Sequence, residues 1–121
     1  MDRITDRAVK EWINRFLTVI SDKYSAEKVL LFGSRARGDY LINSDVDMII
    51  VSKKFEGVNW LKRLRDVSVE WEGLVLLEAI CYTPEEFEEK KKEIGIVSEA
   101  VKEGVKLIAR GKRCIPAHKQ M

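Results

Sequence analysis

Residues 29–51 read VLLFGSRARGDYLINSDVDMIIV. Two short apolar runs, 29–32 and 48–51, enclose a polar segment in this stretch. The first run is aliphatic or aromatic and ends at a glycine, which is typical of a buried strand. The second run follows two acidic residues. The stretch therefore predicts a strand, a polar loop and a second strand that carries carboxylates.

The polar loop begins with Gly33 and Ser34. Glycine lets the backbone approach a ligand closely, and the serine hydroxyl can donate a hydrogen bond to that ligand. Exposed amides of a helical turn that starts at Arg35 would favour an anion, and the planar guanidinium of Arg37 suits phosphate oxygens. The loop is a candidate phosphate-binding site, although a Gly-Ser turn also occurs in loops that bind nothing.

Two aspartates follow the loop. Asp45 and Asp47 are two residues apart, so on a strand their side chains project from one face with Cα atoms roughly 6.5 Å apart. Two like charges beside an apolar run repel each other unless a cation neutralises them. Mg²⁺ binds carboxylates together with substrate phosphates, and two such ions roughly 3.5–4 Å apart can clamp a phosphoryl group in line. Asp45 could instead be a turn residue after Ser44, whereas Asp47 lies inside the apolar run.

Together these parts resemble the signature of the DNA polymerase β-like nucleotidyltransferases. The motif consists of Phe32-Gly33-Ser34, ten further residues, and then Asp45-Val46-Asp47-Met48. The strings GSRARGD and SDVD are most similar to the minimal nucleotidyltransferases of this superfamily. Because the spacing and both carboxylates must occur with the Gly-Ser pair, the signature is specific.

The resemblance implies an activity and a set of site residues. A minimal nucleotidyltransferase transfers a nucleoside monophosphate, here AMP from ATP or the equivalent from another NTP, to a hydroxyl acceptor and releases pyrophosphate. By the same resemblance, Gly33, Ser34 and Arg37 would hold the triphosphate. Asp45 and Asp47 would bind two Mg²⁺ ions and act as catalytic residues.

The family also has a third acidic residue on a later strand. Residues 74–82 form an apolar run with one acid in the middle, Glu78, and a lone buried glutamate would be costly to ionise without a partner. Glu78 is therefore our candidate for the third catalytic and metal-binding carboxylate, which in the family helps to deprotonate the acceptor. The family usually has Asp here, so the longer Glu needs its backbone set back. Glu70 and Glu72, in the preceding polar turn, are alternatives.

Length and composition indicate one ordinary globular domain. The chain has 121 residues, 35% of them charged, and a net charge of +2 at pH 7. Basic and acidic residues are interleaved, so there is no strong nucleic-acid signal. Cys81 and Cys114 make neither a disulfide framework nor a metal cluster, which favours a reducing compartment. Without an apolar run long enough for a membrane span, and without a signal peptide, we expect a cytoplasmic protein.

Helices are predicted around the strands. Apolar residues recur every three or four positions in 5–23, 58–70 and 96–110, and a capping pattern starts another helix at Thr83. We therefore expect a small α/β (α+β) domain in which helices pack against a mixed sheet of at least three strands. This is the palm-like nucleotidyltransferase fold that the resemblance implies.

Gly111 would stop the last helix. The sequence thus predicts a nucleotidyltransferase domain at 1–111 and a flexible C-terminal tail at 112–121. The only histidine, His118, falls in this tail, and we expect it to be incidental rather than catalytic.

An aromatic residue of the first predicted helix and the basic residues of the second are expected to have structural roles rather than to bind a ligand. Trp12 lies on the apolar stripe of helix 5–23 and is expected to pack in the core rather than to stack on a base. Lys62, Arg63 and Arg65 lie off the apolar face of helix 58–70. We expect a solvated basic surface there, with contact to a triphosphate or a partner as the alternative.

The acceptor is expected on another molecule. Larger relatives carry an added domain that shapes the acceptor pocket, and this chain has no room for one. Minimal nucleotidyltransferases typically pair with a helical HEPN-type protein, a toxin RNase, which they bind and in some cases inactivate by adding AMP. The resemblance thus implies an antitoxin. Two alternatives stay open: an antitoxin that only covers its partner, and an enzyme with a small acceptor such as an aminoglycoside. A homo-oligomer is open as well.

Overall fold

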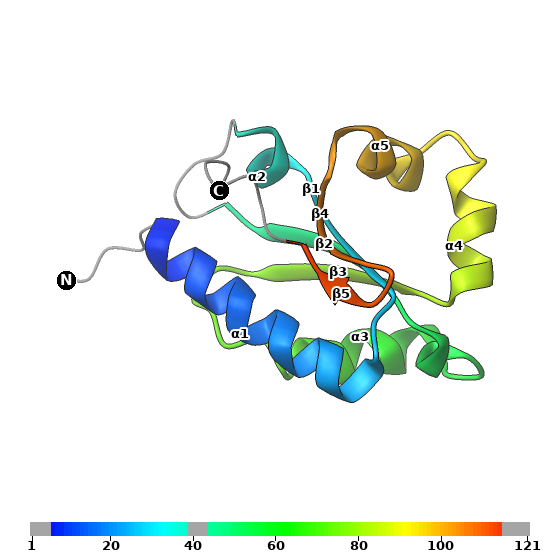
Figure 1. The fold of residues 1–121 in the computed structure, drawn as a ribbon, viewed down its shortest axis with the longest axis horizontal. Coiled ribbons are helices and arrows are strands. Elements are labelled where there is room, and N and C mark those ends of the chain that lie inside the picture. The colour runs from blue at the N-terminus through cyan, green and yellow to red at the C-terminus, as the bar shows by residue number, and fades with distance from the viewer. Residues whose placement is uncertain (1–5, 39–43, 115–121) are drawn as a thin grey trace.

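The structure, a computed structural model, describes residues 6–38 and 44–114. Five strands form one mixed sheet in the order β3-β2-β1-β4-β5 (Figure 1). In chain order the strands are β1 Lys28–Phe32, β2 Val46–Val51, β3 Leu77–Tyr82, β4 Val105–Ala109 and β5 Lys112–Arg113. β2 and β3 are parallel, and the other neighbours are antiparallel. The expected mixed sheet of at least three strands is confirmed.

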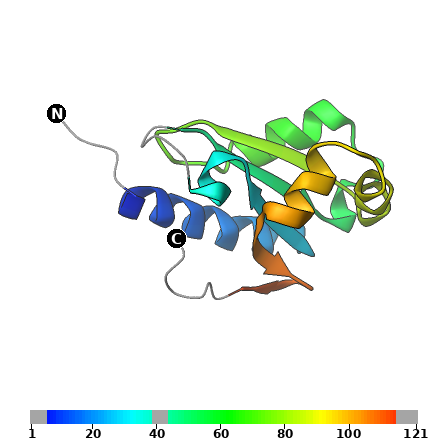
Figure 2. The same cartoon turned by 90° about the horizontal axis from the view of Figure 1, so that it is seen from above.

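Helices lie on both faces of this sheet. They are α1 Asp6–Tyr24, α2 Ser34–Arg37, α3 Trp60–Ser68, α4 Pro84–Lys91 and α5 Ile96–Glu103, with a 3-10 turn, Lys53–Phe55, after β2. α1 and α3 cover one face, and α2, α4 and α5 lie on the other (Figure 1, Figure 2). The central strands β1 and β2 are therefore buried from both sides, which is why both are largely apolar.

Each face of the sheet has its own core. Met48 of β2 lies in the first core with Phe16 of α1, and Ile49 lies in the second with Phe87 of α4. Side chains alternate along a strand. Asp47 consequently shares the face of Ile49, which is the face that also carries α2 and α5.

Trp12 packs as predicted. Its ring meets the ring of Trp71 edge-on with centroids 6.5 Å apart, and Phe16 contacts the same indole at 5.5 Å. The indole of Trp71 donates a hydrogen bond to the carbonyl of Val75 at 2.8 Å. These contacts fix α1 against the segment that leads into β3. None of the helices within 6–38 and 44–114 has the length and hydropathy that a membrane span requires.

The predicted helix 96–110 is wrong in its second half. α5 ends at Glu103, the amide of Gly104 donates to the carbonyl of Ala100 at 2.7 Å, and the chain then enters β4. Apolar residues in 105–109 fit a helical spacing but equally suit a strand. β4 pairs with the free edge of β1. That partner is far away in sequence, so a local pattern does not reveal it.

The flexible tail was predicted to start at residue 112, but the ordered sheet continues past that point. Lys112–Arg113 form β5 and pair with β4, and the amide of Cys114 donates to the carbonyl of Leu107 at 3.0 Å. The first residues of the predicted tail thus belong to the sheet. Residues 115–121, with His118, lie outside the described residues. Both cysteines are free thiols, and burial raises the pKa of Cys81 to about 12.

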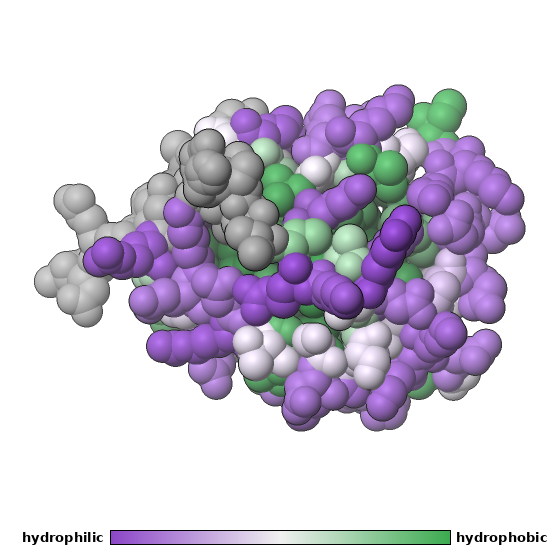
Figure 3. All heavy atoms as spheres, viewed as in Figure 1, coloured by the Kyte–Doolittle hydropathy of each residue, from purple (hydrophilic) through white to green (hydrophobic). Residues whose placement is uncertain are grey.

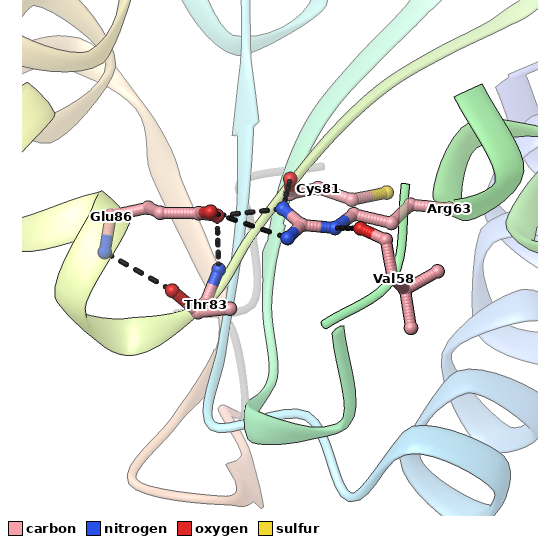
Figure 4. Close-up of polar contacts among 5 residues, drawn as sticks. All are labelled: Val58, Arg63, Cys81, Thr83 and Glu86. Carbon is pink, nitrogen blue, oxygen red and sulfur yellow. Dashed lines mark hydrogen bonds and ion pairs between the residues drawn. The ribbon is translucent and has the colours of Figure 1, made fainter. Parts of the chain in front are cut away.

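Arg63 is buried, which contradicts the solvated surface predicted for it. Its side chain donates to the carbonyls of Val58 and Cys81 at 2.9 and 3.1 Å and binds the carboxylate of Glu86 at 2.6 and 3.2 Å (Figure 4). Glu86 also closes the predicted capping box of α4 with Thr83. The hydrogen bond from Arg63 holds the pKa of Glu86 below its usual value. Arg63 therefore ties α3 to the end of β3 and the start of α4.

Candidate active site

The predicted site residues meet at one end of the sheet. The register of β1 and β2 sets Phe32 opposite Asp47, and the register of β2 and β3 sets Asp47 beside Glu78. Gly33 directly follows Phe32. Because neighbouring strands lie about 4.8 Å apart, the glycine, the aspartate and the glutamate form a row across three strands.

Asp47 leans over Gly33. The glycine has φ 78°, a conformation that side chains disfavour. A Cβ added to Gly33 would overlap Oδ2 of Asp47 and lie 3.2 Å from its Cγ. Glycine is thus required twice here, by the backbone turn and by the carboxylate that occupies the adjacent space.

The predicted helical turn is present as α2, which begins at Ser34, one residue before the predicted start at Arg35. The amides of Ala36 and Arg37 both donate to the carbonyl of Gly33 at 3.1 Å, which closes the turn directly after β1. Ser34 and Arg37 are therefore held on the same short turn, one strand away from Asp47.

Arg35 has a role that the sequence analysis missed. Its Nε donates to the carbonyl of Ser44 at 3.0 Å, so it ties α2 to the residue just before Asp45. The repeated arginines of the GSRAR string were the available signal, but only the folded chain shows that Arg35 donates to the backbone of Ser44 while the charge of Arg37 acts on Asp47.

The three acidic side chains interact electrostatically. Burial, together with the nearby negative charges of Glu78 and Asp45, raises the pKa of Asp47 to about 6. A hydrogen bond shared with Glu78 acts in the same direction, and the positive charge of Arg37 opposes it. The site therefore concentrates negative charge, and Asp47 keeps its proton to a higher pH than a solvated aspartate does.

Glu78 has the predicted neighbour but not the predicted burial. It lies beside Asp47 in the sheet, yet its side chain is exposed. The reason is that β3 is an edge strand with only β2 beside it, and Glu78 is near the start of that strand. Its apolar sequence neighbours therefore do not surround it.

The donor chemistry of the site fits Mg²⁺ shared with a nucleotide. Among the described residues, no three His, Cys, Asp or Glu side chains are arranged as a complete ligand set for one ion. Mg²⁺ does not need such a set, because it usually takes one or two carboxylates and completes its shell with water and substrate phosphates. Asp45 and Asp47, crowded and repelling each other, match that requirement.

Comparisons with known proteins identify the family of this chain. The sequence pattern of the family described as "Nucleotidyltransferase domain" matches residues 13–106. Two candidate protein adenylyltransferases of Methanocaldococcus jannaschii are 44% identical over 48 residues and 46% identical over 46 residues. Each match covers 38% of this chain and 44% of the relative, so the matched stretch spans less than half the length of either relative.

The fold has a close counterpart among crystal structures. A candidate nucleotidyltransferase from Sulfolobus solfataricus superposes with a TM-score of 0.62 and 26% sequence identity, over 90% of this chain and 93% of that one. The family pattern spans β1, β2 and β3, the three strands that carry the site residues. The chain therefore belongs to the nucleotidyltransferase domain family, as its resemblance to the minimal nucleotidyltransferases indicated.

Proposed function

We propose that this protein transfers AMP from ATP to a hydroxyl group on a partner protein. The observation that carries the proposal is the row formed by Gly33, Asp47 and Glu78, with Asp45 close enough to raise the pKa of Asp47. Acidic side chains crowded beside a glycine turn are what a metal-bound triphosphate needs. The relatives named as candidate protein adenylyltransferases support AMP as the group transferred.

Each site residue has a role in this proposal. Ser34 and Arg37 would hold the outer phosphates, and Asp45 and Asp47 would hold Mg²⁺, which would neutralise charge on the triphosphate. The acceptor oxygen attacks the α-phosphorus, the bond from that phosphorus to the bridging oxygen breaks, and pyrophosphate leaves. Glu78, exposed beside Asp47, takes the proton of the acceptor hydroxyl. Its exposure suits a group that must meet a second molecule.

An apolar surface beside the acids favours a protein acceptor. Leu74 and Leu76 are 77% and 70% exposed at the open edge of the sheet. The carbonyl of Leu76 accepts a hydrogen bond from the amide of Val46 at 2.8 Å, which places this surface directly next to Asp45. A protein partner can bury exposed leucines, whereas a polar sugar such as an aminoglycoside gains little from them. The HEPN-type helical protein implied by the resemblance is our candidate partner.

The test is label transfer to the protein encoded beside this one. The chain is incubated with Mg²⁺, ATP labelled at the α-phosphate and that neighbour, and we expect label on the neighbour that disappears with EDTA. Neutralisation of the partner without any label, unchanged in Asp47→Asn, would support the antitoxin that only covers its partner. Pyrophosphate release with small hydroxyl acceptors, but not with the protein, would favour a small-molecule enzyme.

Gly33→Ala is expected to harm the site beyond its effect on the turn. Gly57 is a matched control, because its φ of 74° is similar but an added Cβ there meets no described atom within 4 Å. Gly57→Ala should therefore cost only backbone strain of about 1–2 kcal/mol. Gly33→Ala adds the displacement of the Asp47 carboxylate and should lose most label transfer. Equal activity of the two variants would show that Gly33 serves only the turn.

A further inference from the structure

A cavity lies on the face of the sheet that carries Asp47, at the end of the sheet away from the acidic row. It measures about 300 Å³, and its lining includes Lys28 at the start of β1 and Arg110 after the end of β4. β1 runs from Lys28 toward Gly33, so the strand separates this cavity from the row that contains Asp47. The volume is at the lower end of the range for small-molecule sites.

The lining of the cavity is strongly basic. Lys28, Lys91, Lys106 and Arg110 contribute to it, and no Asp or Glu is among the described residues that line it. Lys91 forms an ion pair with Glu88 at 3.0 Å. For the other three cations, no ion pair is found among the residues that the structure describes, and the charge of Glu88 acts on Lys28 only from a longer distance. Such a concentration of one charge, in a chain whose net charge is only +2, selects an anion at this place.

The floor of the cavity is apolar and includes an aromatic ring. Leu30, Phe87 and Ile108 contribute to it but are at most 5% exposed, so the apolar side chain open to a ligand is Val101, which is 45% exposed. The ammonium groups of Lys28 and Lys91 lie 5.0 and 5.6 Å from the centre of the Phe87 ring. In Figure 3, less polar surface lies near α5 and β4 with hydrophilic side chains beside it. A ligand here would meet positive charge around an apolar base.

Arg110 occupies a position that its residue type disfavours. Arg110 and Gly111 form the two-residue connection between the paired residues Ala109 and Lys112, with φ 54° and 77°. Two positive φ values in succession are those of a type I′ turn, whose first position favours Asn, Asp or Gly. An arginine placed there against that preference puts a guanidinium at the cavity, which indicates that the side chain is used.

We propose that this cavity binds a small phosphorylated organic molecule, of about the size of a nucleoside monophosphate. Its phosphate contacts Lys28, Lys106 and Arg110, and its apolar portion lies against Val101. A nucleic acid polymer fits less well, because the basic residues converge on one cavity and the mild net charge provides no extended track for a phosphate backbone. This site is independent of nucleotidyl transfer at the acidic row.

The test is a titration of the protein with AMP, and separately with inorganic pyrophosphate, in the presence of EDTA. Binding is monitored residue by residue through the amide chemical shifts of the whole chain. We expect saturable shifts of the amides of Lys28, Lys106 and Arg110. Shifts confined to Gly33–Arg37 would place the anion at the acidic site instead and overturn the proposal. Absence of saturable binding would overturn it as well. So would a single-stranded oligonucleotide that binds these residues while AMP does not compete.

Two variants separate a binding role from a structural one. Arg110→Asn suits the turn better, so it should keep or raise the melting temperature while weakening AMP binding by about tenfold or more, the loss expected for one charged contact. Lys106→Ala should weaken binding similarly. Lys10→Ala on α1, exposed on the other side of the sheet, removes the same charge as a control and should change nothing. Equal affinity in all of these proteins would refute the site.

Discussion

Asp47→Asn is expected to lower nucleotidyl transfer by a factor on the order of 10²–10³ or more, the loss typical of removing one preorganised electrostatic group. Asparagine has nearly the same shape, so it fits over Gly33 and keeps the strand in place. It lacks the negative charge that would hold Mg²⁺ and the triphosphate together. The rate of label transfer from ATP, measured for folded protein at saturating Mg²⁺, gives the effect.

The same variant is expected to be more stable than the wild type when no metal is present. The pKa of Asp47 is about 6 in the folded chain, above its ordinary value of 3.8, so the ionised carboxylate destabilises the fold. This penalty is complete above pH 6 and disappears as the pH falls from 6 toward 3.8. The difference in free energy of unfolding between Asp47→Asn and the wild type should therefore be largest above pH 6 and shrink in acid.

Asp22→Asn on α1 is the matched control. Asp22 is exposed and lies on the opposite face from the row, so neither activity nor the pH profile of stability should change. If Asp47→Asn retained full transfer activity, the carboxylate would have no part in the reaction. If Asp47→Asn were also less stable than the wild type above pH 6, the inference that the ionised carboxylate of Asp47 destabilises the fold would be wrong as well.

Arg63→Ala is expected to lower the free energy of unfolding by about 2–3 kcal/mol, because it removes a buried side chain and leaves carbonyl groups without their charged donor, whereas the partly exposed carboxylate of Glu86 can be solvated. Arg63 is 6% exposed, and the change would leave the carbonyls of Val58 and Cys81 and the carboxylate of Glu86 without their donor (Figure 4). The aromatic ring of Trp60 would also lose the guanidinium 5.9 Å from its centre. Urea unfolding followed by circular dichroism measures the loss.

Arg65→Ala, two residues along the same helix, separates burial from charge. Arg65 is exposed, as predicted, so its removal should cost less than about 0.5 kcal/mol. Arg63 lies near the end of β3, whereas Glu78 is near its start, so the folded fraction of Arg63→Ala should keep its transfer rate. Similar losses of stability in both variants would mean that Arg63 is not the joint between α3, β3 and α4.

The local motif located the elements that carry the candidate site. Gly33 and Ser34 directly follow β1, Asp47 lies on β2 and Asp45 directly precedes that strand, because turn chemistry and strand patterns operate over a few residues. The sequence did not reveal that Phe32 is paired with Asp47 or that Asp47 lies beside Glu78, since strand register depends on residues far apart. For the same reason Glu78 was predicted to be buried: its neighbours in sequence are apolar, but its strand is at the edge.

The errors elsewhere also arise from long-range packing. Val105, Leu107 and Ile108 suit a helix or a strand equally, and the open edge of β1 decides between them. Arg63 looked like one of three surface cations on a helix. Its burial depends on Glu86, which the capping pattern at Thr83 had already placed correctly at the start of α4. A local rule thus located the carboxylate, but only the assembled fold supplied its arginine.

The most direct test of the shared acidic site uses Mn²⁺ in place of Mg²⁺, added with a non-hydrolysable ATP analogue to isotope-labelled protein. Paramagnetic broadening should be strongest for the amides of Gly33, Ser34, Asp47 and Glu78, and it should be much weaker in Asp47→Asn. Broadening centred on another part of the chain, or equal in the wild type and the variant, would show that the carboxylates and the glycine turn do not bind a metal-bound nucleotide together.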